Sequence, residues 1–306
     1  MSKYMIRAML MVVVIGAMVT SRSFAESAAW TEDWDAAVKQ ASKENKDILV
    51  GFTGSDWCHW CIKLNEEVFD HDTFVKAATK DFVLVKLDFP RGKPQPAKIR
   101  QRNQRLAGEF GVQGYPTIFL VDSQGRPYAR TGYQPGGPTA YLPHLSELQK
   151  VRQERDALLK QAESAKASEK AAILDKALSL VVSSIGTLSG YDSIIATIVE
   201  LDTENTAGLK TKYGTMLALK GAVGKLQTGD LKGAIKIIDA FLEEHKPEGD
   251  PKQRFLFLKG IAHYHSKELP QAVAALEEAL KADPEGQLAD DVKNAIEQFK
   301  SELPKN

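Results

Sequence analysis

Short apolar runs separated by turn residues fill the first half of the chain, and these runs predict a β-sheet. Each run has the length of a strand and is bounded by polar or turn-forming residues. Extended segments are expected at residues 48–52, 82–87, 117–121 and, after a turn at residues 122–125, 127–131.

Two helices are predicted between these extended segments. Apolar Cys61, Leu64 and Val68 follow helical spacing, which predicts a helix of about 18 residues from Cys58. The segment 90–98 contains three prolines and is therefore irregular, and a helix follows it over residues 99–110. Strand, helix, strand, helix and hairpin predict an α/β domain, with a central mixed sheet flanked by helices, over residues 26–148.

The remainder, residues 149–306, shows a helical pattern broken by Gly, Asn and Pro, and we expect an all-α domain there. Small and apolar residues recur at tetratricopeptide-like spacing, with a period of about 34 residues, in segment 253–286 and more weakly in segment 215–248. In the first segment they are Gly260, Ala272, Leu276 and Ala279. The alternative is an unrelated helical bundle.

The first 25 residues have the pattern of a secretory signal peptide. Lys3 and Arg7 precede an apolar run of twelve residues, and small Ser23 and Ala25 precede Glu26. The run is shorter than the roughly 20 residues that span a bilayer. We expect a periplasmic or secreted protein, without stable membrane insertion after cleavage. An uncleaved anchor or a buried helix is the alternative.

Charge excludes one class of function. The 306-residue chain has 40 basic and 40 acidic side chains, and residues 1–25 contain three basic and no acidic ones. The mature chain is thus slightly acidic, so we expect no nucleic-acid partner. The basic side chains that cluster locally form either a partner-binding patch or a solvated face, and they are Arg91, Lys93, Lys98, Arg100, Arg102 and Arg105.

The two cysteines of the chain, Cys58 and Cys61, form a Cys-x-x-Cys motif between a predicted strand and a predicted helix. Cys58 is expected at the helix N-cap, where unpaired N–H groups and the positive helix dipole favour a thiolate. Cys61, one turn later on the same face, can close a disulfide on Cys58 and resolve a mixed disulfide. The expected cofactor is this redox-active disulfide alone.

Two segments resemble the thioredoxin superfamily. The motif Trp57-Cys58-x-x-Cys61 resembles its active site, and residues 114–117, Gly-Tyr-Pro-Thr, resemble the loop that carries its cis-proline. The signature at residues 52–61 is similar to that of secreted bacterial thioredoxin-like proteins, and the resemblance extends over about residues 30–145.

The resemblance implies a protein thiol–disulfide oxidoreductase and a role for each site residue. Cys58 would be the attacking thiol and Cys61 the resolving thiol. Pro116 would be the cis-proline opposite the disulfide, and the backbone of Tyr115 would pair with an extended substrate. The remaining docking and redox-tuning residues would be Trp57, His59 and Trp60. For His59 the alternative is an exposed residue of little consequence.

One position departs from the family pattern. The resemblance places Gly51 where thioredoxin has a buried acid that helps to activate the resolving cysteine. Lys46 and Asp47 are close in sequence but are expected ahead of the strand. Proton transfer to Cys61 would then depend on water or on another acid.

Two classes of function remain after the motifs are compared. No metal site is expected, because structural zinc needs four ligands and the chain has no second Cys-x-x-Cys or paired-His motif. The favoured function is disulfide exchange with the thiols and disulfides of exported proteins. An upstream redox partner is also expected. The helical domain would position the substrate or another protein. The alternative is a peptide-binding or protein-binding adaptor whose helical domain is the main functional part. The direction of electron flow stays open.

Overall fold

The computed structural model describes residues 29–303, which divide into two compact units. Unit 1 contains the residues up to Ser164 together with Ile173–Tyr191, and unit 2 contains Ala165–Ala172 and the residues from Asp192 onward. The signal peptide expected at residues 1–25 lies outside the described residues. No helix in residues 29–303 has both the length and the apolar character that crossing a membrane requires.

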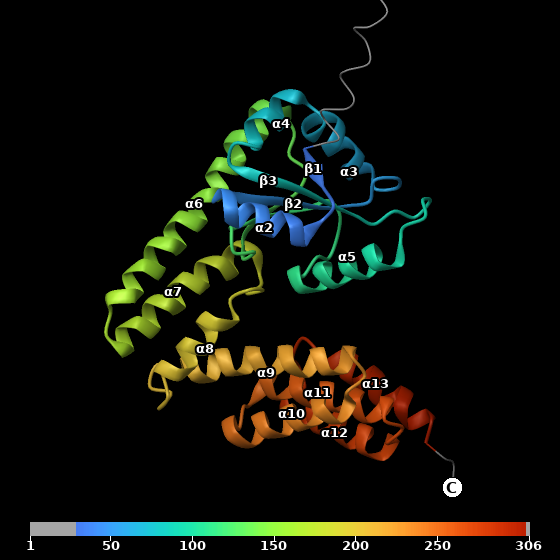
Figure 1. Ribbon diagram of the computed structural model, residues 1–306. Coiled ribbons are helices and arrows are strands. Elements are labelled where there is room, and N and C mark those ends of the chain that lie inside the picture. Colours follow the sequence, from blue (N-terminus) through green and yellow to red (C-terminus); the bar gives the residue numbers. More distant parts are fainter. Residues whose placement is uncertain (1–28, 304–306) are drawn as a thin grey trace, which may run out of the picture. The chain divides into compact units, whose positions relative to one another are not determined.

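Unit 1 is built around a five-stranded mixed sheet with the order β1-β3-β2-β4-β5. Its strands β1, β2 and β3 are labelled in Figure 1. The strands are β1 (Trp30–Thr31), β2 (Asp47–Thr53), β3 (Phe82–Asp88), β4 (Thr117–Val121) and β5 (Pro127–Thr131). β3 runs parallel to both β1 and β2, whereas β4 is antiparallel to β2 and to β5. The four predicted extended segments are therefore strands, and the mixed sheet is confirmed.

Helices cover both faces of this sheet. They are α2 (Trp34–Glu44), α3 (His59–Leu64), the π-helical turn η1 (Asn65–Phe69), α4 (Asp72–Ala78), α5 (Ala97–Phe110) and α6 (Gly137–Ser164). On one face, α3, η1, α4 and α6 share a core with Leu49, Leu84 and Leu120. On the other face, Phe110 of α5 contacts Trp34 of α2 and Phe119 of β4. Burial of both faces explains the nearly continuous apolar runs of the central strands.

The single helix predicted from Cys58 is wrong, because the segment forms two helices. α3 continues into η1, where the N–H of Asp70 donates to the carbonyl of Asn65, five residues earlier. The backbone of His71 is extended, and α4 begins after it. The periodic pattern continues across the break because Val68 and Phe74, on either side of it, enter the same core.

Unit 1 extends past the predicted domain boundary at residue 148. α6 continues to Ser164, and the Arg155 side chain on it is fully buried. Its guanidinium forms an ion pair with Asp122 at 2.9 Å and donates a hydrogen bond to the hydroxyl of Tyr191 at 2.6 Å. These contacts tie α6 and the residues after α7 (Ala167–Ile185) to the β4–β5 turn.

Asp47 is the first residue of β2 and is buried, so the expectation that it lies ahead of the strand is wrong. Its carboxylate accepts a hydrogen bond from the hydroxyl of Tyr128 at 2.6 Å and pairs with Arg152 of α6. Burial raises the pKa of Asp47, whereas Tyr128 and Arg152 act to lower it. Asp47 therefore anchors α6 at the end of the strand that is remote from the cysteines.

The described part of unit 2 has helices as its only regular elements. From α8 onward they are α8 (Asp192–Leu201), α9 (Leu209–Gln227), α10 (Leu231–His245), α11 (Gly249–His265), α12 (Leu269–Ala282) and α13 (Ala289–Ser301). A Cβ atom on Gly260 of α11 would lie 2.7 Å from the side chain of Leu276 on α12. Ala272, Leu276 and Ala279 are fully buried. The small residues singled out in the sequence thus lie where α11 and α12 approach closely.

Candidate active site

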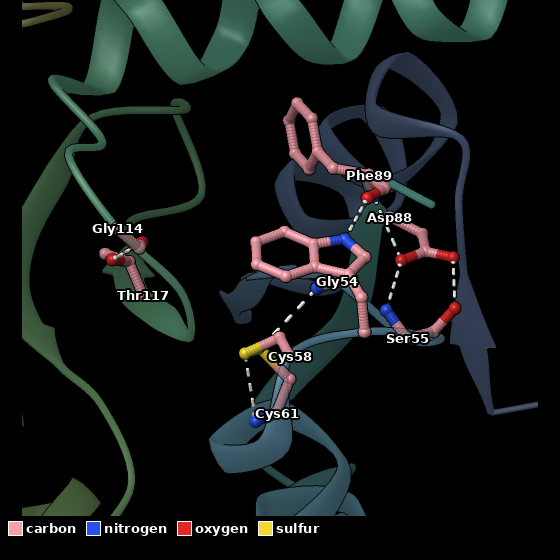
Figure 2. Close-up of a disulfide and its surroundings, with 9 residues drawn as sticks. Gly54, Ser55, Cys58, Cys61, Asp88, Phe89, Gly114 and Thr117 are labelled. Atoms are coloured by element: carbon pink, nitrogen blue, oxygen red, sulfur yellow. Dashed lines mark hydrogen bonds between the residues drawn. A yellow bond between two sulfur atoms is a disulfide. The ribbon is translucent and has the colours of Figure 1, made fainter. Parts of the chain in front are cut away.

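Cys58 and Cys61 form a disulfide at the start of α3, with their Cα atoms 5.2 Å apart (Figure 2). Cys58 is the N-cap residue, and its sulfur accepts a hydrogen bond from the backbone N–H of Cys61 at 3.2 Å. Both side chains are buried, with exposed fractions of 6% for Cys58 and 2% for Cys61. The predicted position at the helix N-cap is confirmed, and Cys61 is the less accessible sulfur.

The turn before Cys58 is fixed to the end of β3. Ser55 donates two hydrogen bonds to the carboxylate of Asp88, from its backbone N–H at 2.9 Å and from its hydroxyl at 2.6 Å (Figure 2). The indole N–H of Trp57 donates to the carbonyl of Phe89 at 2.8 Å. The backbone N–H of Gly54 donates to the sulfur of Cys61 at 3.5 Å. This hydrogen bonding holds both sulfur atoms in a fixed position against the sheet.

A second contact joins this turn to the proline-rich loop after β3. The carboxylate of Asp56 accepts hydrogen bonds from the backbone N–H groups of Arg91 and Gly92, which lower the pKa of Asp56. The guanidinium of Arg91 lies 3.6 Å from the ring centre of Trp57. One member of the basic cluster therefore lies next to the cysteine motif. This stacking could not be predicted from the sequence, because the two segments are far apart in the chain.

The loop at residues 114–117 lies next to the cysteines. The Tyr115–Pro116 peptide bond is cis, as the resemblance implied. Pro116 and Cys61 line the same small cavity. Tyr115 packs edge-on against Trp57 at 5.7 Å between ring centres, and burial raises the pKa of its hydroxyl. The structure thus brings Trp57, Tyr115 and Pro116 together around the disulfide.

His59 and Trp60 lie on the outer side of α3. The Trp60 side chain is 51% exposed and lies 5.1 Å from the ring centre of Tyr133. The ammonium of Lys63 lies over both rings, and the hydroxyl of Tyr133 donates to Glu67 at 2.6 Å. His59 contacts the ring of Trp60. This exposed aromatic surface adjoins the motif, and its member Tyr133 was not predicted.

The position of the missing acid, Gly51, is flanked by Lys86 on β3 and Ile118 on β4. A cavity of about 10 Å³ lies here, lined in part by Gly51, Cys61 and Lys86. Burial lowers the pKa of the Lys86 ammonium, whereas Asp70 and Asp88 raise it. Lys86 was not predicted as a site residue, although it is the one charged residue in the apolar run of residues 82–87. A lysine within an apolar run is the feature of the sequence from which Lys86 could have been identified.

Within residues 29–303, no three His, Cys, Asp or Glu side chains gather into a group that could hold a metal ion. The two sulfur atoms of the site form a disulfide, and such a pair interconverts between a dithiol and a disulfide by transferring two electrons. A thioredoxin-like sheet with a disulfide-forming pair at a helix N-terminus defines a thiol–disulfide oxidoreductase.

Comparison with known proteins agrees with this class. Residues 29–123 match the family described as thioredoxin-like. The chain is 36% identical over 121 residues to disulfide bond reductase DsbH of Chlamydia pneumoniae, which covers 40% of this chain and 73% of that protein. The chain belongs to the thioredoxin-like family.

Two further relatives cover a similar share of this chain. Thioredoxin-related protein DsbJ of Chlamydia pneumoniae is 31% identical over 107 residues, which make up 35% of this chain and 31% of DsbJ. A solved structure described as DsbH oxidoreductase has 34% identity and a TM-score of 0.38, and the match covers 40% of this chain and 88% of that one. The matches to DsbH and DsbJ of Chlamydia pneumoniae each cover less than half of the present chain.

Proposed function

We propose that the protein is an exported enzyme that exchanges disulfides with other exported proteins through Cys58 and Cys61. The observation that carries this proposal is the buried sulfur pair at the N-terminus of α3, with Pro116 beside it and Trp60 exposed next to it. Unpaired N–H groups and the helix dipole at this end stabilise a thiolate. The site thus combines an activated nucleophile with a surface on which a protein can dock.

The proposed reaction has two steps. The Cys58 thiolate attacks one sulfur of a substrate disulfide, and the other substrate sulfur leaves as a thiolate. The Cys61 thiolate then attacks the Cys58 sulfur, which closes the Cys58–Cys61 disulfide and releases the second substrate sulfur. In this proposal Trp57 and Tyr115 shape the edge beside Cys58, and His59 and Trp60 belong to the docking surface.

We place this reaction outside the cytoplasm, in the periplasm or in the secreted fraction. The support is the arrangement of charged, apolar and small residues in positions 1–25. An oxidising compartment also supplies protein disulfides as substrates. An upstream dithiol partner would return the enzyme to its reduced form.

We propose the reducing direction for this exchange. The printed name of the relative DsbH, disulfide bond reductase, favours it. An equilibrium titration of the Cys58–Cys61 pair against glutathione would give its reduction potential. A potential well below that of the glutathione couple supports a reductase, whereas a much higher one indicates an oxidase.

Substrate trapping tests the proposed exchange. In the Cys61→Ser variant the second step cannot occur, so we expect disulfide-linked partners to accumulate on Cys58 in the compartment where the protein resides. Non-reducing gels followed by mass spectrometry would detect them. The matched control is Cys58→Ser, which retains one thiol and is expected to trap few or none. An absence of adducts in the Cys61→Ser variant contradicts the proposal.

A second candidate function is supported by unit 2. A groove of about 470 Å³ lies between α10, α11 and α12, and its lining includes Lys246, Lys252 and Glu278. The tetratricopeptide-like spacing of α11 and α12 suits a protein-binding surface. We therefore propose that this part positions a substrate or another partner. An adaptor that works without redox chemistry would retain its partners in a Cys58→Ser, Cys61→Ser double variant, which co-purification would show.

A further inference from the structure

A cavity next to Cys61 lies between α3 and the sheet. Its lining includes Cys61 from α3, Gly51 and Lys86 from the sheet, and Trp30 from β1. Its volume of about 10 Å³ is close to the lower limit for one water molecule. The indole N–H of Trp30 is buried and has no hydrogen-bond partner among the described residues. The residues of the lining, among them Lys86 and Trp30, thus have side chains that carry hydrogen-bond donors.

The sheet register explains why the cavity forms at this point. Lys86, Gly51 and Ile118 are direct neighbours across β3, β2 and β4. Neighbouring residues in register point to the same face of a sheet, and Leu49 and Leu84 place that face towards α3. Gly51 has no side chain, so the space that a side chain would fill stays open between Lys86 and Cys61.

Few charged side chains lie near the ammonium of Lys86. Its ammonium lies 5.2 Å from the ring centre of Trp30. The acids that act on it are Asp70, which follows η1, and Asp88, two residues along its own strand. Ile118 of β4 and Pro116, in the loop before that strand, also line the cavity, and neither has a titratable side chain. Cys61 is the titratable group that shares the cavity with Lys86.

We propose that Lys86 takes up and returns the proton of Cys61 through one water molecule in this cavity. It would perform the task that the absent acid at Gly51 leaves open. This inference rests on the proposed disulfide exchange and assigns one of its proton transfers. Lys86 acts on Cys61 through this water molecule and does not touch the sulfur, because the cavity lies between the two side chains. It is therefore a positioning residue.

The proposed step balances without an outside reactant. The Cys61 thiol gives its proton to the water, and the water gives a proton to the neutral amine of Lys86. A Cys61 thiolate and a Lys86 ammonium result, and the thiolate attacks Cys58. When the Cys58–Cys61 disulfide is later reduced, the ammonium returns a proton to Cys61. Burial lowers the pKa of Lys86, which makes the neutral amine accessible at a lower pH than for a free lysine.

The effect of Lys86 on the ionisation of Cys61 can be tested in a variant that has one thiol. The chain has two cysteines, so Cys58→Ser leaves Cys61 as the one thiol. In this background Lys86→Met is expected to raise the pKa of Cys61 by about one unit, because a nearby cation favours the thiolate. The rate of iodoacetamide alkylation at a fixed pH below the pKa would fall about tenfold. The matched control is Lys76→Met, which replaces an exposed lysine on α4. It is expected to leave the pH dependence of Cys61 alkylation unchanged.

A second variant tests the proton transfer itself. Lys86→Arg keeps a positive charge but cannot accept a proton. In the chain with both cysteines, it is expected to slow the closure of Cys61 on a Cys58–glutathione mixed disulfide by about tenfold or more. Rapid mixing of the reduced chain with glutathione disulfide would measure this rate. Circular dichroism would verify that each variant is folded.

The outcomes separate this inference from the proposed function. Unchanged Cys61 alkylation in Lys86→Met, or closure at the parent rate in Lys86→Arg, overturns the role of Lys86. In either case, partners trapped by Cys61→Ser would leave the disulfide exchange in place. Absent partners in Cys61→Ser would instead contradict the exchange itself, whatever the result for Lys86.

Discussion

At the scale of single residues, the position of Trp57 depends on a glycine. A Cβ atom on Gly54 would lie 2.5 Å from the Trp57 ring, and that ring is held by its hydrogen bond to Phe89. Arg91 covers the ring as well. The close approach of Gly54 therefore sets where the turn before Cys58 lies against the sheet.

Gly54→Ala is accordingly expected to displace the indole and to destabilise the protein by about 1–3 kcal/mol, the usual cost of overpacking. The control is Gly108→Ala in α5, where a Cβ atom meets no atom within 4 Å. In a helix interior this change is expected to stabilise by about 0.5–1 kcal/mol. Urea unfolding of the two variants would give both values, and equal effects would contradict the packing argument.

Some residues of the site could be predicted from local sequence and others could not. Cys58, Cys61 and Pro116 belong to short motifs whose geometry depends on neighbours in the chain. Lys86 matters because Gly51, on another strand, leaves space beside it, and sheet register is not visible in a single segment. Tyr133 likewise meets Trp60 through tertiary packing.

At the scale of elements, α3 is a short helix whose first turn depends on its cap. The sulfur of Cys58 is the acceptor for the N–H of Cys61, where Ser, Thr, Asp or Asn commonly serves. η1 extends the helix, and Tyr133 is bonded to Glu67 within it. The cap and this contact together fix the direction of the helix that carries Cys61.

The cap predicts a difference between two variants that both lack the disulfide. Cys58→Ser keeps an acceptor at the N-cap and Cys58→Ala does not, so the serine variant is expected to be more stable by about 0.5–2 kcal/mol. Urea unfolding under reducing conditions would measure this difference. Equal stability of the two variants would show that an acceptor at this N-cap position does not stabilise α3.

At the scale of the whole chain, unit 1 is held together by charges from segments that are distant in sequence. Arg152 and Arg155 of α6 pair with the buried carboxylates of Asp47 and Asp122. The strands could be predicted from the apolar pattern, but this boundary could not, because arginines on a helix usually face solvent. The domain end expected at residue 148 lies within α6, ahead of both arginines.

A chain that ends at residue 148 would lose both arginines and leave Asp47 and Asp122 without these partners. We expect it to be less stable than a chain that ends at residue 191, by about 3–5 kcal/mol, the usual cost of breaking a buried pair. Thermal and urea unfolding of the two chains would show the difference.

Single substitutions in the full chain provide the control for this truncation. Arg155→Met is expected to show a similar loss of stability, whereas Arg105→Met, at an exposed pair with Glu109, is expected to cost less than about 1 kcal/mol. Equal stability of the two truncated chains would place the end of the folding unit before α6 is complete.

The sulfur that caps α3 is also the atom that the proposed reaction modifies. Its electron density changes whenever Cys58 passes from thiolate to mixed disulfide to intramolecular bridge, and in the bridged form the amide of Cys61 donates a hydrogen bond to it. The nitrogen and proton resonances of this one amide therefore provide a built-in reporter, through which magnetic resonance could follow each stage of turnover without any added label on the sulfurs.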